Sequence, residues 1–230
     1  MIKDNLADVE KRIQAACDRA GRDRNEVTLI AVSKTKPISM IEEVMEMGIV
    51  DFGENKVQEL CEKEGIIQTP LKWHMIGHLQ RNKVKNIVDK VCLIHSVDSL
   101  RLAKQISEEA EKKHTIVNIL IEVNIAYEDT KFGVSKEDTL PLILEISKLP
   151  NIKIKGLMTI APFVENPEDN RIHFSNLSNL LIDIKSKNID NIDMDILSMG
   201  MTGDFEVAIE EGATMVRVGT GIFGQRNYNI

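Results

Sequence analysis

Residues 27–33 read VTLIAVS and are followed directly by Lys34. Unbroken apolar and β-branched runs of this length are typical of parallel strands, which are buried on both faces. Before this run, residues 2–20 carry apolar side chains at the spacing of one helix face, and Gly21 can end that helix. We therefore predict an amino-terminal helix over about residues 3–20, followed by a buried parallel strand.

The same two patterns alternate along the rest of the chain. Strand patterns follow at residues 49–52, 72–76, 91–96, 115–123, 152–158, 195–198 and 214–218. Helix patterns separate them at residues 38–47, 56–64, 82–88, 99–112, 139–148, 167–186 and 204–210. Eight strands that alternate with helices in 230 residues indicate an α/β fold with a parallel sheet and favour a closed (β/α)₈ TIM-like barrel. An open doubly wound sheet is the alternative, because both folds share this periodicity.

Length and composition agree with one folded domain over residues 1–230. The apolar fraction is 43%, and 29 basic against 36 acidic residues give a formal charge of −7, which excludes a disordered chain. The longest uncharged run, residues 172–182, is too short to span a membrane. No linker or low-complexity tract divides the chain, so we predict a single domain that does not enter a membrane.

The amino terminus and the cysteines predict a cytoplasmic location. Residues 1–13, MIKDNLADVEKRI, contain no apolar core of a secretory signal. Cys17, Cys61 and Cys92 are too widely and unevenly spaced for a disulfide framework or a zinc ligand set. We therefore expect reduced cysteines.

Neither a nucleic-acid site nor a metal site is predicted. The balance of charge is acidic, so the basic residues Arg81, Lys83 and Lys85 are interpreted as a solvated helix face, with a regulatory anion site as the alternative. His74 and His78 lie four residues apart, but the residues before them predict a strand and no carboxylate occupies the metalloprotease position.

Lys34 is the first candidate functional residue, because the active groups of a barrel collect at the carboxyl ends of its strands. Burial at the end of an apolar strand would lower the pKa of the amine, and a neutral amine is what Schiff-base formation with an aldehyde requires. Snorkelling to solvent is the alternative. Lys36 precedes Pro37, which keeps its backbone extended, and is expected to lie further out.

Two loops in the last third of the chain predict a phosphate site. Residues 198–204, SMGMTGD, and residues 216–224, VRVGTGIFG, accompany the seventh and eighth strands, where barrels hold phosphate through backbone N–H groups. Gly219 and Gly221 would allow close approach, and Thr202 and Thr220 can donate hydroxyls. Ordinary tight turns are the alternative.

A lysine and a phosphate loop match the aldehyde and phosphate ends of pyridoxal phosphate, and Arg217 lies between them in the barrel. Near the pyridine nitrogen a guanidinium can only donate a hydrogen bond, which would keep that nitrogen unprotonated and restrain carbanion chemistry. A surface ion pair is the alternative, weakened by the apolar neighbours Val216 and Val218.

Seven blocks of the sequence carry a family resemblance: AVSKTKP, FGENKVQEL, WHMIGHLQRNKVK, IHSVDS, GLMTIAP, LSMGMTGD and VRVGTGIFG. In this order they resemble the pyridoxal phosphate homeostasis protein family, single-domain relatives of the amino-terminal barrel of alanine racemase. The resemblance implies a fold-type III barrel, pyridoxal 5′-phosphate as cofactor, a role in vitamin B6 and amino-acid homeostasis, and no catalytic turnover.

The resemblance also assigns cofactor-binding residues and no catalytic ones. It implies a Schiff base on Lys34, with Asn55 beside the cofactor and Arg217 at the ring nitrogen. The other cofactor-binding residues expected are Ser198, Met201, Thr202, Gly219 and Thr220. The family usually has serine where this chain has Thr202, a change that keeps the hydroxyl and adds a methyl group.

A weak pyridoxal-dependent racemase is the alternative function. Such a racemase needs a second base, normally a tyrosine from an appended domain and a partner subunit. This chain has only Tyr127 and Tyr228, neither in a recognisable racemase motif, and it stops at Ile230. We therefore favour a monomeric binding or carrier protein, with pyridoxal-dependent apoenzymes as transient partners.

Overall fold

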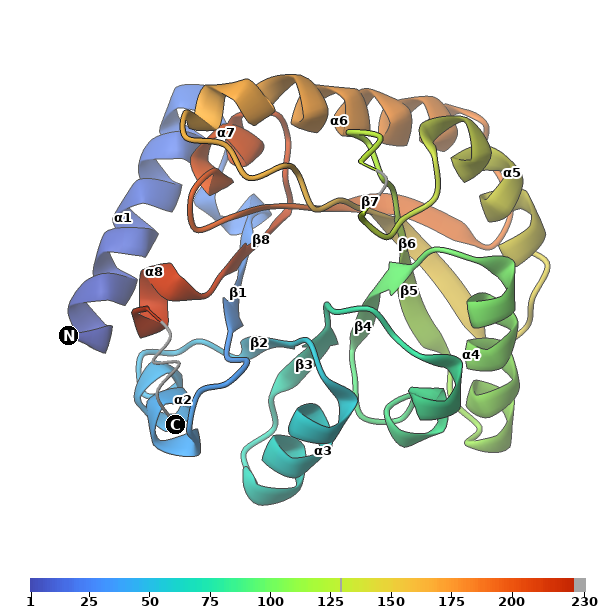
Figure 1. Cartoon of the computed structure of the whole chain (residues 1–230), viewed down its shortest axis with the longest axis horizontal. Helices are drawn as coiled ribbons and strands as arrows, with labels where there is room; N and C mark the ends of the chain where they lie inside the picture. The colour runs from blue at the N-terminus through green and yellow to red at the C-terminus, as the bar shows by residue number, and fades with distance from the viewer. Residues whose placement is uncertain (129, 226–230) are drawn as a thin grey trace.

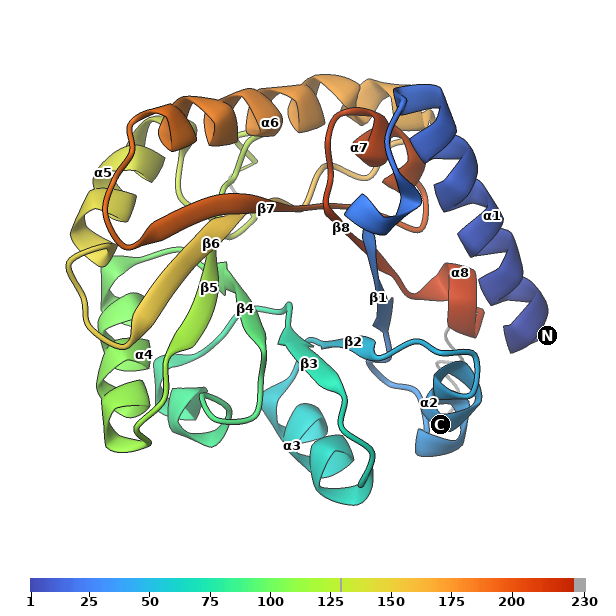
Figure 2. The same ribbon diagram turned by 180° about the vertical axis from the view of Figure 1, so that it is seen from behind.

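Strand β1 (Thr28–Val32) pairs in parallel with β2 (Asp51–Glu54) on one side and with β8 (Met215–Val218) on the other, so the sheet closes on itself. The computed structural model describes residues 1–128 and 130–225, and its strands follow one another around a ring in chain order (Figures 1 and 2). The other strands are β3 (Lys72–Met75), β4 (Leu93–Val97), β5 (Val117–Glu122), β6 (Ile152–Met158) and β7 (Ile192–Met201). This closure confirms the predicted eight-stranded barrel and excludes the open sheet.

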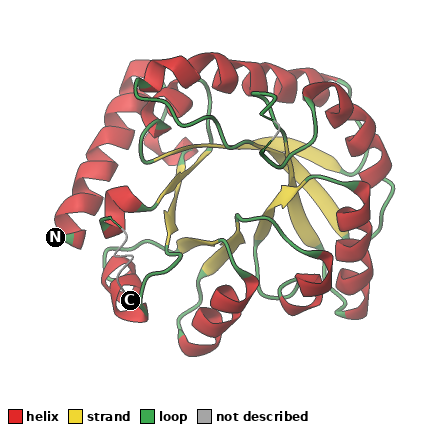
Figure 3. Ribbon diagram, in the orientation of Figure 1, coloured by secondary structure: helices red, strands yellow, loops and turns green. Residues whose placement is uncertain are grey.

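Helices surround the strands as an outer layer (Figure 3). They are α1 (Ile2–Ala20), α2 (Ile38–Met45), α3 (Val57–Ile66), α4 (Leu100–Lys112), α5 (Lys136–Ile146), α6 (Arg171–Ser186), α7 (Phe205–Glu210) and α8 (Thr220–Phe223). In the part of the chain that the structure describes, no helix has the length and apolar character needed to cross a membrane.

Three helix predictions differ from the structure, and in one of them residues 167–170 form a 3₁₀ helix, η3 (Pro167–Asn170), before α6 begins at Arg171. The predicted helix at 82–88 is a 3₁₀ helix, η2 (Arg81–Asn86), which ends before Ile87 although Val84, Ile87 and Val88 are all buried at helical spacing. Helix α5 starts before the predicted residue 139, because the Ser135 hydroxyl accepts a hydrogen bond from the N–H of Asp138 (3.1 Å) and caps an earlier turn.

The sheet separates two apolar clusters. Ile94, Ile119 and Phe174 belong to the larger one, between strands and helices. Leu93, Leu120 and Met158 form a separate cluster with partly buried Cys92, Ile196 and Met215. Side chains two positions apart on a strand point to the same face of the sheet. The inward face therefore also carries the residues that lie two positions after members of this second cluster: His95, Glu122, Ser198 and Arg217. Polar side chains therefore line the barrel on the carboxyl-terminal side of an apolar floor.

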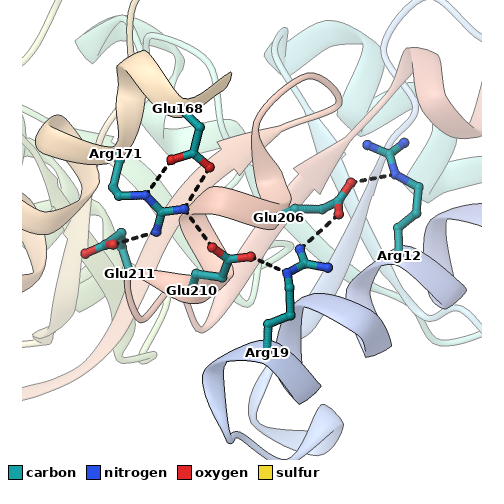
Figure 4. Close-up of polar contacts among 7 residues, drawn as sticks. All are labelled: Arg12, Arg19, Glu168, Arg171, Glu206, Glu210 and Glu211. Atoms are coloured by element: carbon teal, nitrogen blue, oxygen red, sulfur yellow. Dashed lines mark hydrogen bonds and ion pairs between the residues drawn. The ribbon is translucent and has the colours of Figure 1, made fainter. Parts of the chain in front are cut away.

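A chain of arginine–glutamate ion pairs fastens α1 to α7 and α6 (Figure 4). Arg19 donates from Nε to Glu210 Oε1 (2.6 Å) and from Nη2 to Glu206 Oε2 (3.1 Å). Arg12 Nε donates to Glu206 Oε1 (2.8 Å), and Arg171 Nη2 donates to Glu210 Oε2 (2.7 Å). The chain ends in further pairs of Arg171 with Glu168 and Glu211. Glu210 thus bridges arginines from two different helices.

Replacing Glu210 with glutamine is expected to reduce stability at pH 7 by about 1 kcal/mol, because two charge-assisted hydrogen bonds weaken at a mostly buried position. Burial alone would raise the pKa of Glu210, but the hydrogen bonds from Arg171 and Arg19 outweigh it and hold the pKa below 4.5. A depressed pKa stabilises the fold above 4.5 and loses that contribution as the pH falls below it. Melting temperatures of the wild type and Glu210→Gln should therefore differ at pH 7 and differ less at about pH 3.

The exposed Glu62→Gln serves as the matched control and should melt like the wild type at both values of pH. A gap between Glu210→Gln and the wild type that is the same at both pH values would contradict a role for the charge.

Candidate functional site

Lys34 lies in the turn that follows β1 and is half-buried. Ile30 and Val32 of β1 share the inward face, and continuing their alternation past the end of the strand predicts Lys34 on that side of the barrel mouth. The next residue, Thr35, has φ of 62°, a left-handed conformation that is uncommon for a residue other than glycine. The turn is therefore held by its surroundings.

A buried polar cluster beneath this turn supplies the support. Lys63 of α3 donates to the backbone oxygen of Ser33 (2.7 Å), to Glu54 Oε1 (2.8 Å) and to Glu59 Oε1 (2.7 Å). The Ser33 hydroxyl donates to Glu54 Oε1 (2.6 Å), and the N–H of Thr35 donates to Glu59 Oε1 (2.5 Å). Every link of the cluster ends on α3 or on the end of β2, so α3 positions the Lys34 turn.

Glu54 lies in the interior of the protein. As part of FGEN it can be interpreted as a helix-terminus carboxylate, but it is the last residue of β2 and is fully buried. Burial raises the pKa of its carboxyl, opposed by hydrogen bonds from Lys63 and Ser33. No sequence signal marked Lys63, which reads as an ordinary polar position of an amphipathic helix.

Asn55 follows Glu54 and is half-buried beside the end of β3. A side chain at Gly77 would place its Cβ 2.4 Å from the backbone oxygen of Asn55, so only glycine permits this approach of β3 to β2. The residue that caps α3 is Lys56, not Asn55. The asparagine side chain is thus not explained by helix capping.

The two predicted phosphate loops meet each other. Thr202 follows β7, and Gly219 leads into α8 directly after β8. The Thr220 hydroxyl lies 3.2 Å from the Thr202 hydroxyl, which also accepts from the N–H of Gly221 (3.3 Å). Met201 closes β7 and is partly exposed. Hydroxyls and backbone N–H groups from loops far apart in sequence therefore converge at one place on the barrel mouth.

Arg217 is a buried cation on the inward face of β8. Its Nη1 donates to Ser198 Oγ (2.7 Å) and its Nη2 to the backbone oxygen of Thr159 (2.8 Å). Burial lowers the pKa of Arg217 to about 10, with Glu122 and Asp204 acting in the opposite direction. The group stays charged at neutral pH, and its partners are neutral oxygens, unlike those of the surface ion pair that was the alternative.

Lys36 anchors the chain rather than lying free at the rim. Its Nζ donates to the backbone oxygens of Phe223 (3.1 Å) and Gly224 (3.2 Å), at the carboxyl end of α8. These bonds tie the segment after β1 to the segment after β8. Lys36 is therefore assigned a structural role.

Two histidines on neighbouring strands were missed or misplaced by sequence reasoning. His74, paired in the sequence with His78, instead contacts His95 of β4, with 3.0 Å between Nδ1 and Nε2. His78 stacks on Phe132, at a ring-centroid distance of 3.9 Å. Strand alternation within residues 91–96 could have placed His95 inside the barrel, but nothing in the sequence named its partners.

Comparison with known proteins places this chain in a family. The family model described as "Alanine racemase, N-terminal domain" matches residues 5–227. The chain is 47% identical over 226 residues to the pyridoxal phosphate homeostasis protein of Aquifex aeolicus (strain VF5), covering 98% of each chain. PipY of Synechococcus elongatus PCC7942, solved with PLP bound, superposes with a TM-score of 0.84 at 31% identity, over 97% of this chain and 100% of that one. A protein of unknown function from Bifidobacterium adolescentis superposes with a TM-score of 0.91 at 36% identity, over 96% and 94% of the two chains.

Proposed function

This chain belongs to the pyridoxal phosphate homeostasis protein family, and from that membership we propose that it binds pyridoxal 5′-phosphate covalently on Lys34 and serves intracellular vitamin B6 and amino-acid homeostasis. The observation that supports the proposal is that three features lie at or near the carboxyl ends of strands β1, β7 and β8, which neighbour one another in the barrel. These are the Lys34 turn, the buried Arg217 and the paired loops at Thr202 and Thr220.

The residues present fit this cofactor. Pyridoxal phosphate supplies an aldehyde that condenses with a lysine amine, a ring nitrogen that accepts a hydrogen bond, and a phosphate dianion. Lys34 would take the aldehyde, and Arg217 would donate to the ring nitrogen. Thr202, Gly219 and Thr220 would hold the phosphate through hydroxyls and backbone N–H groups.

Three other residues complete the proposed binding set. Asn55 would flank the cofactor from the end of β2, and Met201 would cover it at the rim. Ser198 accepts the Arg217 hydrogen bond (2.7 Å) and would orient the guanidinium toward the ring. An arginine that donates and never accepts would keep the ring nitrogen unprotonated, which weakens the cofactor as an electron sink.

We propose further that the chain carries the cofactor without catalytic turnover. The Tyr127 hydroxyl donates to Glu137 (2.7 Å) at an exposed position, which supports a local surface role rather than that of a second base. Tyr228 lies outside the described residues. Transient transfer to pyridoxal-dependent apoenzymes, a monomeric state and a cytoplasmic location stay predictions.

Borohydride trapping tests the proposal. The protein is incubated with pyridoxal phosphate, reduced and digested, and the modified peptides are mapped. We expect a pyridoxyl group on Lys34, its near-complete loss in Lys34→Ala, and wild-type labelling in the exposed Lys56→Ala at the same mouth. A group mapped to Lys36 or elsewhere would overturn the assignment of Lys34.

The same preparation distinguishes carrier from racemase. Loaded protein is incubated with L-alanine and other amino acids, and the products are separated by chiral chromatography. We expect no D-amino acid above the buffer level. Enantiomer formation that disappears in Lys34→Ala would replace the carrier proposal with the racemase.

A further inference from the structure

Five side chains form a continuous hydrogen-bonded row through the barrel, from the start of β2 to β8. We call this set, Asp51, His74, His95, Ser198 and Arg217, the polar row. Its successive distances are 2.9 Å from Asp51 Oδ1 to His74 Nε2, 3.0 Å from His74 Nδ1 to His95 Nε2, 2.9 Å from His95 Nδ1 to Ser198 Oγ and 2.7 Å from Ser198 Oγ to Arg217 Nη1. The row crosses the interior between β4 and β7 and ends on the proposed ring-nitrogen site.

The direction of each hydrogen bond follows from the cationic end. Arg217 can only donate, so Ser198 Oγ accepts from it and has one hydrogen left for His95 Nδ1. His95 then donates from Nε2 to His74 Nδ1, which leaves the Nε2–H of His74 for the Asp51 carboxylate. Each hydrogen bond of the row then has one donor and one acceptor, and the last donor, His74 Nε2–H, faces the Asp51 carboxylate.

With both histidines neutral, the opposite direction fails at the anionic end. If His95 Nδ1 donated to Ser198, His74 would have to donate from Nδ1 and would present a lone pair to Asp51. Two acceptors would then face each other across 2.9 Å, unless Asp51 took up a proton. An ionised Asp51 therefore selects one tautomer, Nε2–H, for both histidines.

Burial supports a neutral His95. His74 is 1% exposed, and His95 and Ser198 are fully buried. Burial, together with His74 and Arg217, holds the pKa of His95 well below 6.5. A neutral His95 is what the assigned tautomer requires.

Groups from the neighbouring elements do not interrupt the row. Cys92 Sγ lies 3.4 Å from His74 Nε2, but burial raises the pKa of this thiol to about 12, so it stays neutral and donates to the backbone oxygen of Trp73. Lys72 Nζ lies 3.9 Å from Asp51 Oδ2, the carboxylate oxygen that is not bonded to His74. Glu122 and Asp204 act electrostatically on Arg217 at the other end.

We propose that Asp51, His74 and His95 are positioning residues for Arg217. The row holds the Ser198 hydroxyl with its lone pairs toward the guanidinium, and a change at Asp51 is transmitted along it to the proposed ring-nitrogen site. Its significance for cofactor binding rests on the proposed function, but the row is a property of the cofactor-free protein and is tested there.

Nitrogen-15 NMR of the cofactor-free protein reads the tautomers directly. We expect both His74 and His95 as neutral Nε2–H rings at pH 7, with His95 unchanged down to about pH 5. Ser198→Ala should shift the His95 signals toward mixed tautomers, because Nδ1 loses its donor. Ser96→Ala is the matched control, since this equally buried serine of β4 donates to the backbone oxygen of Gly77 outside the row.

Hydrogen exchange of the Arg217 guanidinium N–H groups tests how firmly the row holds this side chain, separately from the folding of the protein. We expect exchange about fivefold faster in Asp51→Asn, the factor that corresponds to weakening one hydrogen bond, and no change in Ser96→Ala. Nδ1–H histidines in the wild type, or Arg217 exchange unchanged in Asp51→Asn, would overturn the proposal. If only the borohydride labelling of Lys34 failed, the proposed cofactor site would be wrong, while the proposal for the polar row would still stand.

Discussion

Replacing Lys63 with methionine is expected to lower the free energy of unfolding by about 3–5 kcal/mol. Methionine keeps the length of the side chain but removes a charge that bonds to three oxygens, at 2.7 to 2.8 Å, at a position only 6% exposed. Glu54 would be left fully buried without its cation, and an uncompensated buried charge is far more costly than the net gain from the pair. Urea denaturation at pH 7 measures the loss.

A second substitution separates charge from packing. Lys63→Met combined with Glu54→Gln leaves no buried charge and should recover part of the lost stability. Lys56→Met, on the exposed residue that precedes α3, is the matched control and should stay within about 0.5 kcal/mol of the wild type. A loss below about 1 kcal/mol in Lys63→Met would show that solvent or neighbouring groups replace the lysine.

The expected loss bears on the proposed site because the cluster holds the turn that carries Lys34. Thr35 keeps its left-handed φ of 62° while its N–H donates to Glu59, and Glu59 is held by Lys63. We therefore expect Lys34 to be labelled more slowly by pyridoxal phosphate and borohydride in Lys63→Met than in the wild type. This difference should be present at denaturant concentrations too low to unfold the variant.

Replacing Glu122 with glutamine is expected to stabilise the protein by about 3 kcal/mol above pH 7 and to change little below pH 4.5. Burial raises the pKa of this carboxyl to about 7; Asp98 adds to the increase, and Arg217 opposes it. Between 4.5 and 7 the unfolded chain ionises while the folded protein keeps its proton, so stability falls as the pH rises through this window. Glutamine cannot ionise, and the penalty disappears.

Unfolding free energies measured from about pH 4 to 8 test this expectation. The free energy of unfolding of Glu122→Gln should exceed that of the wild type by an amount that grows between pH 4.5 and pH 7 and stays constant above pH 7. The exposed Glu111→Gln on α4 is the matched control and should follow the wild type throughout. A constant difference at every pH would mean that the glutamate acts through packing or hydrogen bonding instead of its charge.

Much of the candidate site was predictable because it lies at strand ends. Lys34 and Arg217 stand at the end of the first apolar run and within the last, so their inward side was readable from alternation alone. The convergence of Thr202 with Thr220 was expected from loop position in a barrel, since carboxyl ends of neighbouring strands meet at one mouth. At residues 82–88 the period of apolar side chains did not distinguish an α-helix from a 3₁₀ helix: Val84, Ile87 and Val88 stand at helical spacing and are buried, yet the segment forms η2.

Side chains that join distant segments were not predictable in this way. Lys63 occupies an unremarkable polar position of a predicted helix, and only the packing of α3 against β2 brings it to Glu54. His95 and Ser198 are 103 residues apart and meet across the interior at 2.9 Å. Neither contact leaves a local pattern, because each depends on barrel closure and strand register.

The sequence by itself determined the alternation of strands and helices, the placement of polar residues at strand ends, and the family. These are local properties, set by the period of apolar side chains along each segment. Only the tertiary structure decided which inward side chains touch, and therefore that a buried lysine supports the Lys34 turn and that two histidines link Asp51 to Arg217 through Ser198. Burial also sets the pKa values of His95 and Glu122, because a charge that is well solvated in water becomes costly inside a closed barrel.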